Sequence, residues 1–517
     1  MKTSLQHLLA RVFIITIAAL FLLASAVAQT ETGQITGRVV DPNGAAVPGA
    51  SVTVKSVSTG AERSVTANQE GSYTVTSLQP GQYDITAQGG SFAAATIRVE
   101  VSAGGKLSVD NKLGLQAVAG EVNVVAGEGG IQVNTTTQEL AEVSSGKQVR
   151  ELPTITRNPY ALVGTSGNAT DVDPSGRGTG FSINGQRSAS TNILLDGGEN
   201  VDNFTATVGQ SVPLDSVQEF RVITSNFSAV YGRASGGIVN VATRSGSNEF
   251  HGTLYAFNRL SRLASNGFDN NAQSLPKGVF NRNQFGYAVG GPIQKNKLFF
   301  FNSTEWVRVR SNASVINQVP TPQLIAASNA NTQAFFAANS VQFPINGAVR
   351  TVGDVRTSLC AAPCDPADPA NAAFFTGAFF TLPATTPAFG EVRYSVPADV
   401  GAGSPQNSYQ TVIRADWAPT SDTSVYGRMA IEKQSFFEGS VSSSPYAGFN
   451  TGFNAFNQNH LISVTHNFTP NFVSQTKLIF NRLNSSQPLG ERPSSPTLFL
   501  RGNVVSRLFG NLVALPG

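Results

Sequence analysis

Apolar and polar residues alternate with a period of two along seven stretches in the second half of the chain, and this is the period of a β-strand with two unlike faces. In the stretch 423–433, Met429 lies on the apolar face and Arg428 on the polar face. Ile413 and Arg414 are separated in the same way. We therefore predict seven amphipathic strands, at residues 250–258, 282–291, 297–310, 409–418, 423–433, 459–468 and 472–484.

The connections between these strands alternate strictly between long and short. In chain order they are 259–281 (long), 292–296 (short), 311–408 (very long), 419–422 (short), 434–458 (long) and 469–471 (short). Outer-membrane β-barrels have short periplasmic turns and long outer loops, and their strands are about ten residues long with apolar residues facing lipid. A soluble β-sandwich also alternates, but it has no reason to keep this order of connections. The sequence therefore predicts barrel strands that run up and down, with every short turn in the periplasm.

The segment 29–116 shows shorter strands at even spacing, separated by turn sequences. Such spacing is typical of a β-sandwich. The expected strands include Ile35–Val39, Ala50–Val54, Tyr73–Val75 and Tyr83–Ile85, and the expected turns are Asp41–Gly44, Asn68–Gly71 and Gln79–Gly81.

The segment 131–247 predicts a mixed α/β unit with tight turns. One helix is expected at Leu140–Glu151, and short apolar runs at Ile193–Leu195 and Ile238–Val241 predict strands. Each run adjoins a pair of glycines, which let the backbone take positive φ where the chain turns sharply. No cluster of catalytic side chains accompanies these elements.

Three sequence motifs in this middle segment resemble a known family. ILLDGG (193–198), VQEFRVI (217–223) and YGRASGGIVNVATRSGS (231–247) look like the plug domain of TonB-dependent outer-membrane receptors, and most like the Oar-like subgroup. The alternative is a soluble α/β domain with glycine-rich turns. The residues that carry the resemblance are Asp196, Gly197, Tyr231, Gly232, Gly236, Gly237 and Asn240.

The first segment supports the same resemblance. Its order GRVVDPNGAAVPGASVTV…EGSYTVTSLQPGQYDITA is similar to the carboxypeptidase-regulatory-like domain, a transthyretin-like fold that precedes the plug in Oar-like proteins. The resulting fold class is mainly β: a transthyretin-like sandwich (29–116), a linker (117–130), an α/β plug (131–247) and the first strands of a large antiparallel outer-membrane barrel (248–517). Plugged transporters use 22 strands. We therefore expect this chain to be the N-terminal part of a longer protein.

The linker contains a short segment that resembles a TonB box, the stretch that an energy-transducing partner grips in the periplasm. Its residues are Glu121, Val122, Asn123, Val124, Val125 and Ala126. Alternating β-branched residues suit strand addition to a partner sheet. The alternative is that this stretch is only a linker or the first strand of the plug.

Residues 1–28 have the pattern of a signal peptide. Lys2 and Arg11 flank the start, Val12–Leu23 is apolar, and a small-residue cleavage site predicts a cut between Ala28 and Gln29. The apolar run is too short for the ~20 residues of a membrane-spanning helix. If the mature protein is in a membrane, the sequence therefore places it there as a barrel.

Composition agrees with a membrane β-protein and excludes several functions. Charged residues make up 13% of the chain, against about 25% in soluble globular proteins. The formal charge of +3 supplies no basic stripe for nucleic acid. The four histidines are His7, His251, His460 and His466, and none lies in a zinc-peptidase motif. We expect no enzyme activity, no cofactor and no bound metal.

The connection 311–408 is expected to lie outside secondary structure, on the cell exterior, and to touch ligand. It holds Cys360 and Cys364, and an oxidising compartment favours a disulfide between them.

The resemblance implies a receptor in the outer membrane that takes up an external ligand when a TonB-type protein supplies energy. An Oar-like adhesion or export protein on the same scaffold, and a soluble periplasmic β-protein, are the alternatives. The sequence leaves iron chelates, oligosaccharides and peptides open as ligands.

Overall fold

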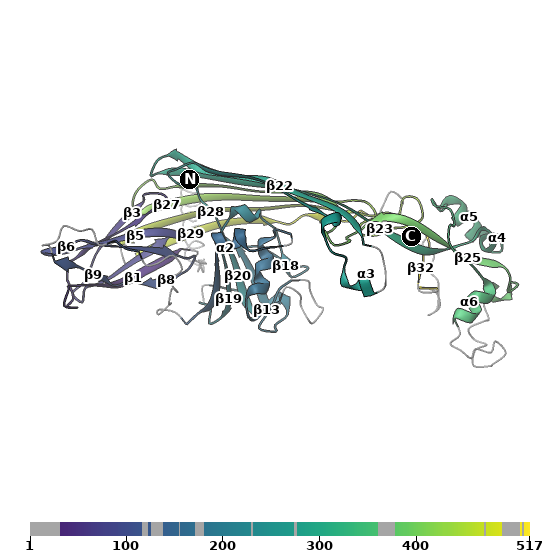
Figure 1. Ribbon diagram of the computed structural model, residues 1–517, viewed down its shortest axis with the longest axis horizontal. Helices are drawn as coiled ribbons and strands as arrows, with labels where there is room; N and C mark the ends of the chain where they lie inside the picture. Colours follow the sequence, from purple (N-terminus) through teal and green to yellow (C-terminus); the bar gives the residue numbers. More distant parts are fainter. Residues whose placement is uncertain are drawn as a thin grey trace, which may run out of the picture.

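The computed structural model describes residues 32–115, 123–125, 138–154, 156–170, 180–228, 231–272, 277–359, 378–469, 472–488, 507–508 and 511–516. They form three units in chain order: an N-terminal domain (33–115), a plug (138–243) and a long curved sheet that we call the barrel sheet (251–486) (Figure 1). Among these residues, no helix has the length and hydrophobicity that crossing a bilayer requires.

The N-terminal domain is the predicted β-sandwich. Alternating apolar residues of its two main sheets, such as Ile35, Val52 and Ile85, are fully buried between them. One sheet has the order β4-β1-β8, with β9 also paired to β1, and the other has the order β11-β7-β5-β2-β3. The strands are β1 (Gly33–Val40), β2 (Ser51–Ser56), β3 (Glu62–Thr66), β4 (Ser72–Leu78), β5 (Gly81–Gln88), β7 (Ala95–Val101), β8 (Lys106–Ser108), β9 (Asn111–Lys112) and β11 (Asn123–Val125), with a small ribbon of β6 (Phe92–Ala93) and β10 (Gly114–Leu115).

The plug is built on a five-stranded mixed sheet in the order β12-β19-β20-β15-β16. Strands β15 and β20 are parallel and their other neighbours antiparallel. The plug core contains Tyr160 and Phe220, and it extends to Val412 and Ala430 of the barrel sheet. The elements are β12 (Leu140–Ser145), α2 (Gly146–Glu151), η1 (Pro159–Thr165), β13 (Ala169–Thr170), β14 (Ser182–Ile183), η2 (Ser188–Ser190), β15 (Thr191–Leu195), β16 (Gly198–Glu199), β17 (Val201–Asp202), β18 (Thr207–Val208), η3 (Leu214–Ser216), β19 (Val217–Ser225) and β20 (Gly237–Thr243).

The helix predicted at Leu140–Glu151 is wrong in its first half. Residues 140–145 form β12, which pairs antiparallel with β19. Ser145 then caps α2, because its hydroxyl accepts the Gln148 N–H while the Gln148 side chain accepts the Ser145 N–H. Pairing with a strand about 80 residues away overrides the local helical pattern.

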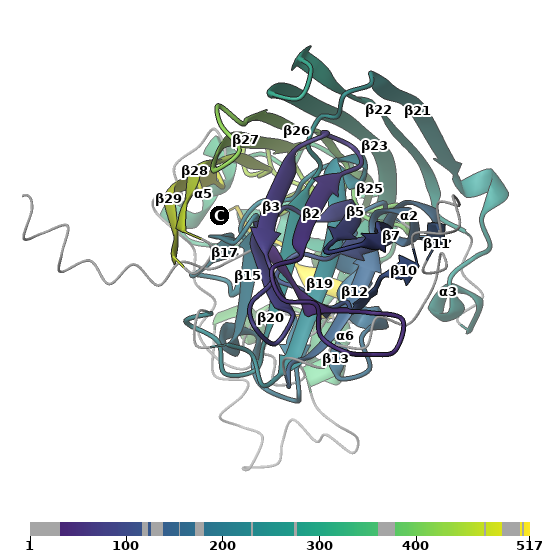
Figure 2. The same ribbon diagram turned by 90° about the vertical axis from the view of Figure 1, so that its left-hand side faces the viewer.

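All seven predicted barrel strands are present and form one antiparallel sheet in chain order. Figure 2 shows this sheet as an arc around the plug. Its two outermost long strands, the first and the last, are not paired with each other in the described part of the chain. The strands are β21 (His251–Leu260), β22 (Val279–Gln294), β23 (Leu298–Pro320), β26 (Gln406–Trp417), β27 (Thr423–Phe436), β28 (Phe453–Thr469) and β29 (Phe472–Arg482).

Successive side chains of the barrel strands alternate between a face directed at the plug and a face directed away from it. On β26 and β27, Arg414, Tyr426 and Arg428 are buried against the plug side, whereas Ile413 and Trp417 are exposed on the other side. Large apolar side chains continue this exposed face on neighbouring strands. They include Leu254, Ile462, Val464 and Leu478. Such an apolar outer face is what a barrel presents to lipid.

The prediction that 311–408 lies outside secondary structure is wrong. Strand β23 continues to Pro320 and pairs along its extension with β25 (Pro387–Pro397). The apolar residues of this region form clusters of their own, around Tyr446 and Phe389. The further elements between and beyond the long strands are η4 (Ser261–Leu263), α3 (Phe268–Ala272), α4 (Pro322–Ala326), α5 (Ala330–Ala338), β24 (Val349–Thr351), α6 (Val352–Leu359), η5 (Ala378–Thr381), β30 (Ser485–Ser486), β31 (Arg507–Leu508) and β32 (Asn511–Val513).

Candidate functional site

The turn between β15 and β16 brings the ILLDGG motif to the barrel sheet. Leu195 and Gly198 pair across the hairpin, and the two residues between them have positive φ, 53° at Asp196 and 70° at Gly197. Two-residue hairpin turns of this kind favour Asp-Gly, because aspartate tolerates a left-handed backbone better than most residues and glycine adopts it freely. The turn therefore fixes the direction of the Asp196 carboxylate.

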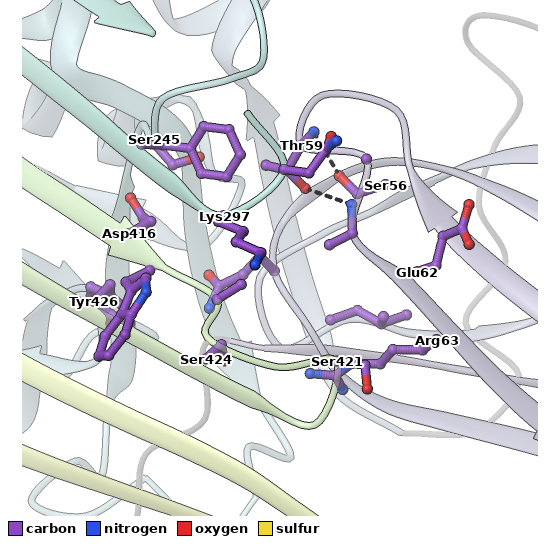
Figure 3. Close-up of a pocket in the computed structure, with 18 of the residues that line it drawn as sticks. Ser56, Thr59, Glu62, Arg63, Ser245, Lys297, Asp416, Ser421, Ser424 and Tyr426 are labelled. Atoms are coloured by element: carbon purple, nitrogen blue, oxygen red, sulfur yellow. Dashed lines mark hydrogen bonds between the residues drawn. The ribbon is translucent and has the colours of Figure 1, made fainter. Parts of the chain in front are cut away.

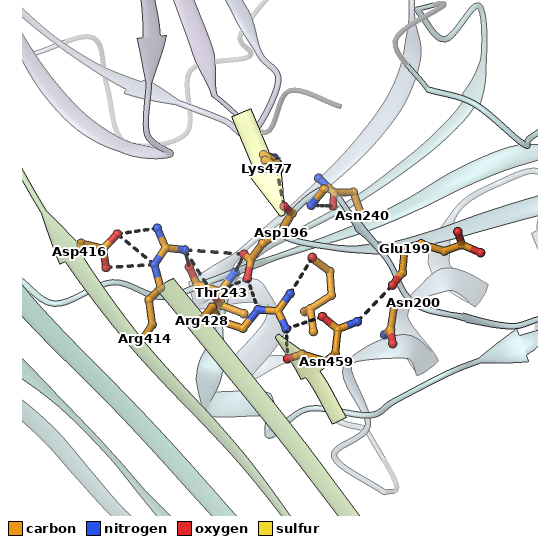
Figure 4. A network of polar contacts seen from close by, with 12 residues as sticks. Asp196, Glu199, Asn200, Asn240, Thr243, Arg414, Asp416, Arg428, Asn459 and Lys477 are labelled. Carbon is orange, nitrogen blue, oxygen red and sulfur yellow. Dashed lines mark hydrogen bonds and ion pairs between the residues drawn. The ribbon is translucent and has the colours of Figure 1, made fainter. Parts of the chain in front are cut away.

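The Asp196 carboxylate joins plug and barrel sheet in a buried network (Figure 4). It accepts hydrogen bonds from the Thr243 N–H at 2.7 Å and from Nε of Arg428 at 3.0 Å. Nη1 of Arg414 lies 3.7 Å from the same carboxylate. The side chains of Asp196 and Arg428 are fully buried, and that of Arg414 is 4% exposed. Charges so far from water are stable only when they are paired and hydrogen-bonded.

The remaining donors of the two arginines are directed to nearby acceptors. Arg428 donates to the backbone and side-chain oxygens of Asn459 and to the Leu195 carbonyl. Arg414 donates to Asp416 at 2.8 Å and to the Thr243 carbonyl. Nζ of Lys477 donates to the Asp196 carbonyl at 3.2 Å. Four consecutive barrel strands, β26 to β29, thus contact this one region of the plug.

Two further polar contacts fix the plug at other points. Arg157 pairs with Asp215 of the plug at 2.5 Å, and its Nε lies 3.7 Å from Glu305 of β23. Glu432 of β27 accepts the N–H of Ser211 at 3.0 Å. The interface therefore combines an apolar part at Val412 and Ala430 with charged and polar anchors around it.

The YGRASGG motif serves the packing of the plug. Tyr231 is 8% exposed and packs with Ile223 and Ile238. The side-chain oxygen of Asn240 accepts the Gly197 N–H at 3.3 Å, so two of the recognised motifs meet. At Gly236, a Cβ would lie 3.1 Å from the Cβ of Gln186.

Replacing Gly237 with alanine is expected to destabilise the plug by about 1–3 kcal/mol, the usual effect of overpacking a core. The new Cβ would lie 2.7 Å from a side-chain carbon of Ile183 and 2.9 Å from the Ile223 carbonyl oxygen, which cannot move independently of its strand. Gly232→Ala is the matched control, because no atom lies within 4 Å of its added Cβ. Urea unfolding of the purified protein measures both, and equal midpoints would contradict this account.

The segment resembling a TonB box is described only at residues 123–125. They form β11, which pairs parallel with β7 of the N-terminal domain, Val124 opposite Ile97. The extended conformation expected for this stretch is therefore present, and its role stays a prediction. Glu121, Val122 and Ala126 lie outside the described residues, as do the cleavage site at Ala28 and Gln29 and the disulfide predicted between Cys360 and Cys364.

Two of the barrel histidines, His460 and His466, have ordinary surroundings. His466 lies 2.8 Å from the hydroxyl of Thr423, and His460 stacks on Phe480. Within the described ranges, no three His, Cys, Asp or Glu side chains are grouped so that they could hold a metal ion.

Comparison with known families agrees with the three units. Residues 34–114 match the carboxypeptidase regulatory-like domain, and residues 134–238 match the TonB-dependent receptor plug domain. Residues 242–512, more than half of the chain, match an outer membrane β-barrel domain. The chain belongs to the TonB-dependent outer-membrane receptors. The protein is accordingly located in the outer membrane.

Two curated relatives of this receptor are TonB-dependent proteins. The TonB-dependent transporter Oar of Myxococcus xanthus is 29% identical over 316 residues, which cover 57% of this chain and 28% of Oar. The probable TonB-dependent siderophore receptor PirA of Acinetobacter baumannii is 26% identical over 176 residues, 32% of this chain and 22% of PirA. The receptor thus spans less than a third of the length of either relative.

A solved structure of the siderophore receptor PirA from Pseudomonas aeruginosa aligns with 67% of this receptor and 41% of its own chain. The identity is 12% and the TM-score 0.39.

The sequence located the plug motifs but not the two arginines that hold them. The alternation of their strands predicts that Arg414 and Arg428 point inward, but it indicates no partner in the plug. Two arginines on the inner faces of adjacent strands, together with an aspartate in the plug motif, are a signal of charge pairing across the interface. Only the fold shows which charges meet.

Proposed function

We propose that this receptor binds an external ligand on the side of the long loops and moves it across the outer membrane when a TonB-type protein pulls the segment 121–126. The observation that supports this most is the seating of the plug, which is held against the barrel sheet by the buried network around Asp196. The plug must be displaced for passage. Polar contacts suit this step, because water can replace each of them during movement.

The proposed function includes no covalent step. The free energy comes from the partner at the inner membrane, and the residues of the receptor bind, seal and transmit force. The printed names of the two curated relatives, a transporter and a probable siderophore receptor, support a transport function. We propose ferric siderophores, oligosaccharides and peptides as the ligand classes to test.

Uptake in a deletion strain tests this function. Radioactive ferric siderophores, oligosaccharides and peptides are supplied to the wild-type strain, to the deletion strain and to a strain that lacks the TonB-type protein. The expected result is that both mutant strains lose uptake of the same class of probe. Normal uptake of every probe in both mutant strains would favour an Oar-like role in adhesion or export instead.

A further inference from the structure

The N-terminal domain has a hydrophobic core of its own. Among the described residues, no cluster of buried apolar side chains includes residues of both this domain and the plug or barrel sheet. Its attachment depends on a few polar contacts. Domain interfaces of this kind allow relative movement, since little apolar surface has to be exposed on separation.

The first contact involves the turn Ser102–Gly105, whose ends are joined by a hydrogen bond from the Gly105 N–H to the Ser102 carbonyl. Both carboxylate oxygens of Glu219 lie within 3.1 Å of the Ala103 N–H, which donates to them. Arg221, two residues further along β19, donates to the carbonyl of the same alanine. All three residues are at most 6% exposed. A single residue of the N-terminal domain is thus held through both of its backbone polar groups.

Arg221 also contacts the entrance of the plug. Its other terminal nitrogen donates to Glu139 at 2.9 Å, and both side chains are at most 10% exposed. Glu139 lies nine residues after the linker (117–130) that leads from the N-terminal domain. Burial raises the pKa of Glu219 to about 7, while the Ala103 N–H and Arg221 favour its charged form.

The second contact lies in the connection between the plug strand β20 and the barrel strand β21. The N–H of Asn248 donates to the Ser58 carbonyl at 2.9 Å, and its side-chain amide donates to the Thr59 carbonyl at 2.7 Å. Beside it, a pocket of about 390 Å³ lies between the hairpin that carries Thr59 and the turns that carry Lys297 and Ser421 (Figure 3). The interface is therefore open next to this contact.

We propose that Glu219 and Arg221 form a latch that holds the N-terminal domain on the plug, and that traction on the linker opens it. Because Arg221 is shared between Ala103 and Glu139, withdrawal of Glu139 removes the charge that orients this guanidinium and weakens its hold on Ala103. The traction rests on the proposed function, whereas the latch is a property of the resting receptor. The N-terminal domain is then released in the same movement that displaces the start of the plug.

The substitution Ala103→Pro removes the N–H that Glu219 accepts without opposing the turn. Gly104 has φ of 64° and Ala103 has no positive φ, the pattern of a type II turn, in which proline is favoured at the second position. Gln69→Pro is the matched control, since Gln69 has the same place in the exposed turn Asn68–Gly71 of this domain. We expect amide hydrogen exchange at Asn248 to become about ten- to a hundredfold faster in Ala103→Pro, the size of one lost charge-assisted hydrogen bond, and to stay unchanged in Gln69→Pro.

The coupling is tested with Glu139→Ala, which imitates withdrawal of this carboxylate. The Ala103 amide is expected to exchange about tenfold faster, whereas Glu142→Ala, an exposed change on β12, is expected to leave it unchanged.

Equal exchange at Asn248 in the two proline variants would overturn the latch. Equal exchange at Ala103 in Glu139→Ala and the wild type would overturn the coupling. Both measurements use purified receptor without its partner. If the exchange rates change as expected but the receptor does not transport, only the proposed function is contradicted.

Discussion

Replacing Asp196 with asparagine is expected to lower the free energy of unfolding of the plug by about 3–5 kcal/mol, the range measured when one partner of a buried ion pair is removed. Asparagine keeps the size of the side chain and tolerates the left-handed backbone at this position. The change removes the charge and one of the two acceptor oxygens, both of which accept hydrogen bonds in the wild type. Arg428 and Arg414 remain buried with less compensation. Of their other partners only the Asp416 carboxylate beside Arg414 is charged, while Asn459, Thr243 and the Leu195 carbonyl are neutral.

Urea unfolding followed by near-ultraviolet circular dichroism of the purified receptor measures this loss. Asp202→Asn is the control, since Asp202 lies in the β17–β18 hairpin of the plug and its carboxylate accepts hydrogen bonds from its own exposed turn. An unchanged midpoint in Asp196→Asn would contradict a structural role of the network.

A second substitution separates charge from shape. Arg428→Met removes the positive charge and keeps much of the apolar stem. If the loss in Asp196→Asn comes from an uncompensated arginine, the double variant Asp196→Asn with Arg428→Met is expected to be less destabilised than the sum of the single variants. Strict additivity would show that the two residues act independently.

Replacing Val124 with proline is expected to abolish transport, while Val124→Ala remains close to the wild type. Strand addition depends on backbone hydrogen bonds, and proline removes a donor and fixes φ. Alanine keeps the donor. The pairing of β11 with β7 shows that residues 123–125 can act as an added strand within this receptor. In the proposed function, the energy-transducing partner bonds to the backbone of this segment.

Uptake and surface abundance are measured together for both Val124 variants. Normal abundance with loss of uptake only in Val124→Pro is the expected result. Equal uptake in the two variants would remove the TonB-box assignment and favour adhesion or export. Loss of the protein from the surface in Val124→Pro would mean that β11 is a structural strand. Ala103→Pro provides a reference in which the N-terminal domain is loosened but the segment 121–126 is intact.

Local pattern was sufficient for much of the fold because alternation is a property of each strand by itself. The period of two placed Arg428 inward and Ile413 outward before any neighbour was known, and both positions are confirmed. The order of short and long connections gave the antiparallel order of the seven strands. The local pattern gave wrong predictions where a strand pairs with a distant segment. Leu140–Ser145 is a strand because it pairs with β19, and β23 continues beyond its predicted end because it pairs with β25.

The sequence by itself determined the three units, the plug motifs and the inward direction of the two arginines. The tertiary structure alone decided their partners: Asp196 and Arg428 are 232 residues apart, and Ala103 and Glu219 are 116 apart. No local period relates positions so distant. Their contact depends on the seating of the plug and on the docking of the N-terminal domain, because a charge or a backbone N–H is satisfied by whichever group the whole fold brings within hydrogen-bonding distance.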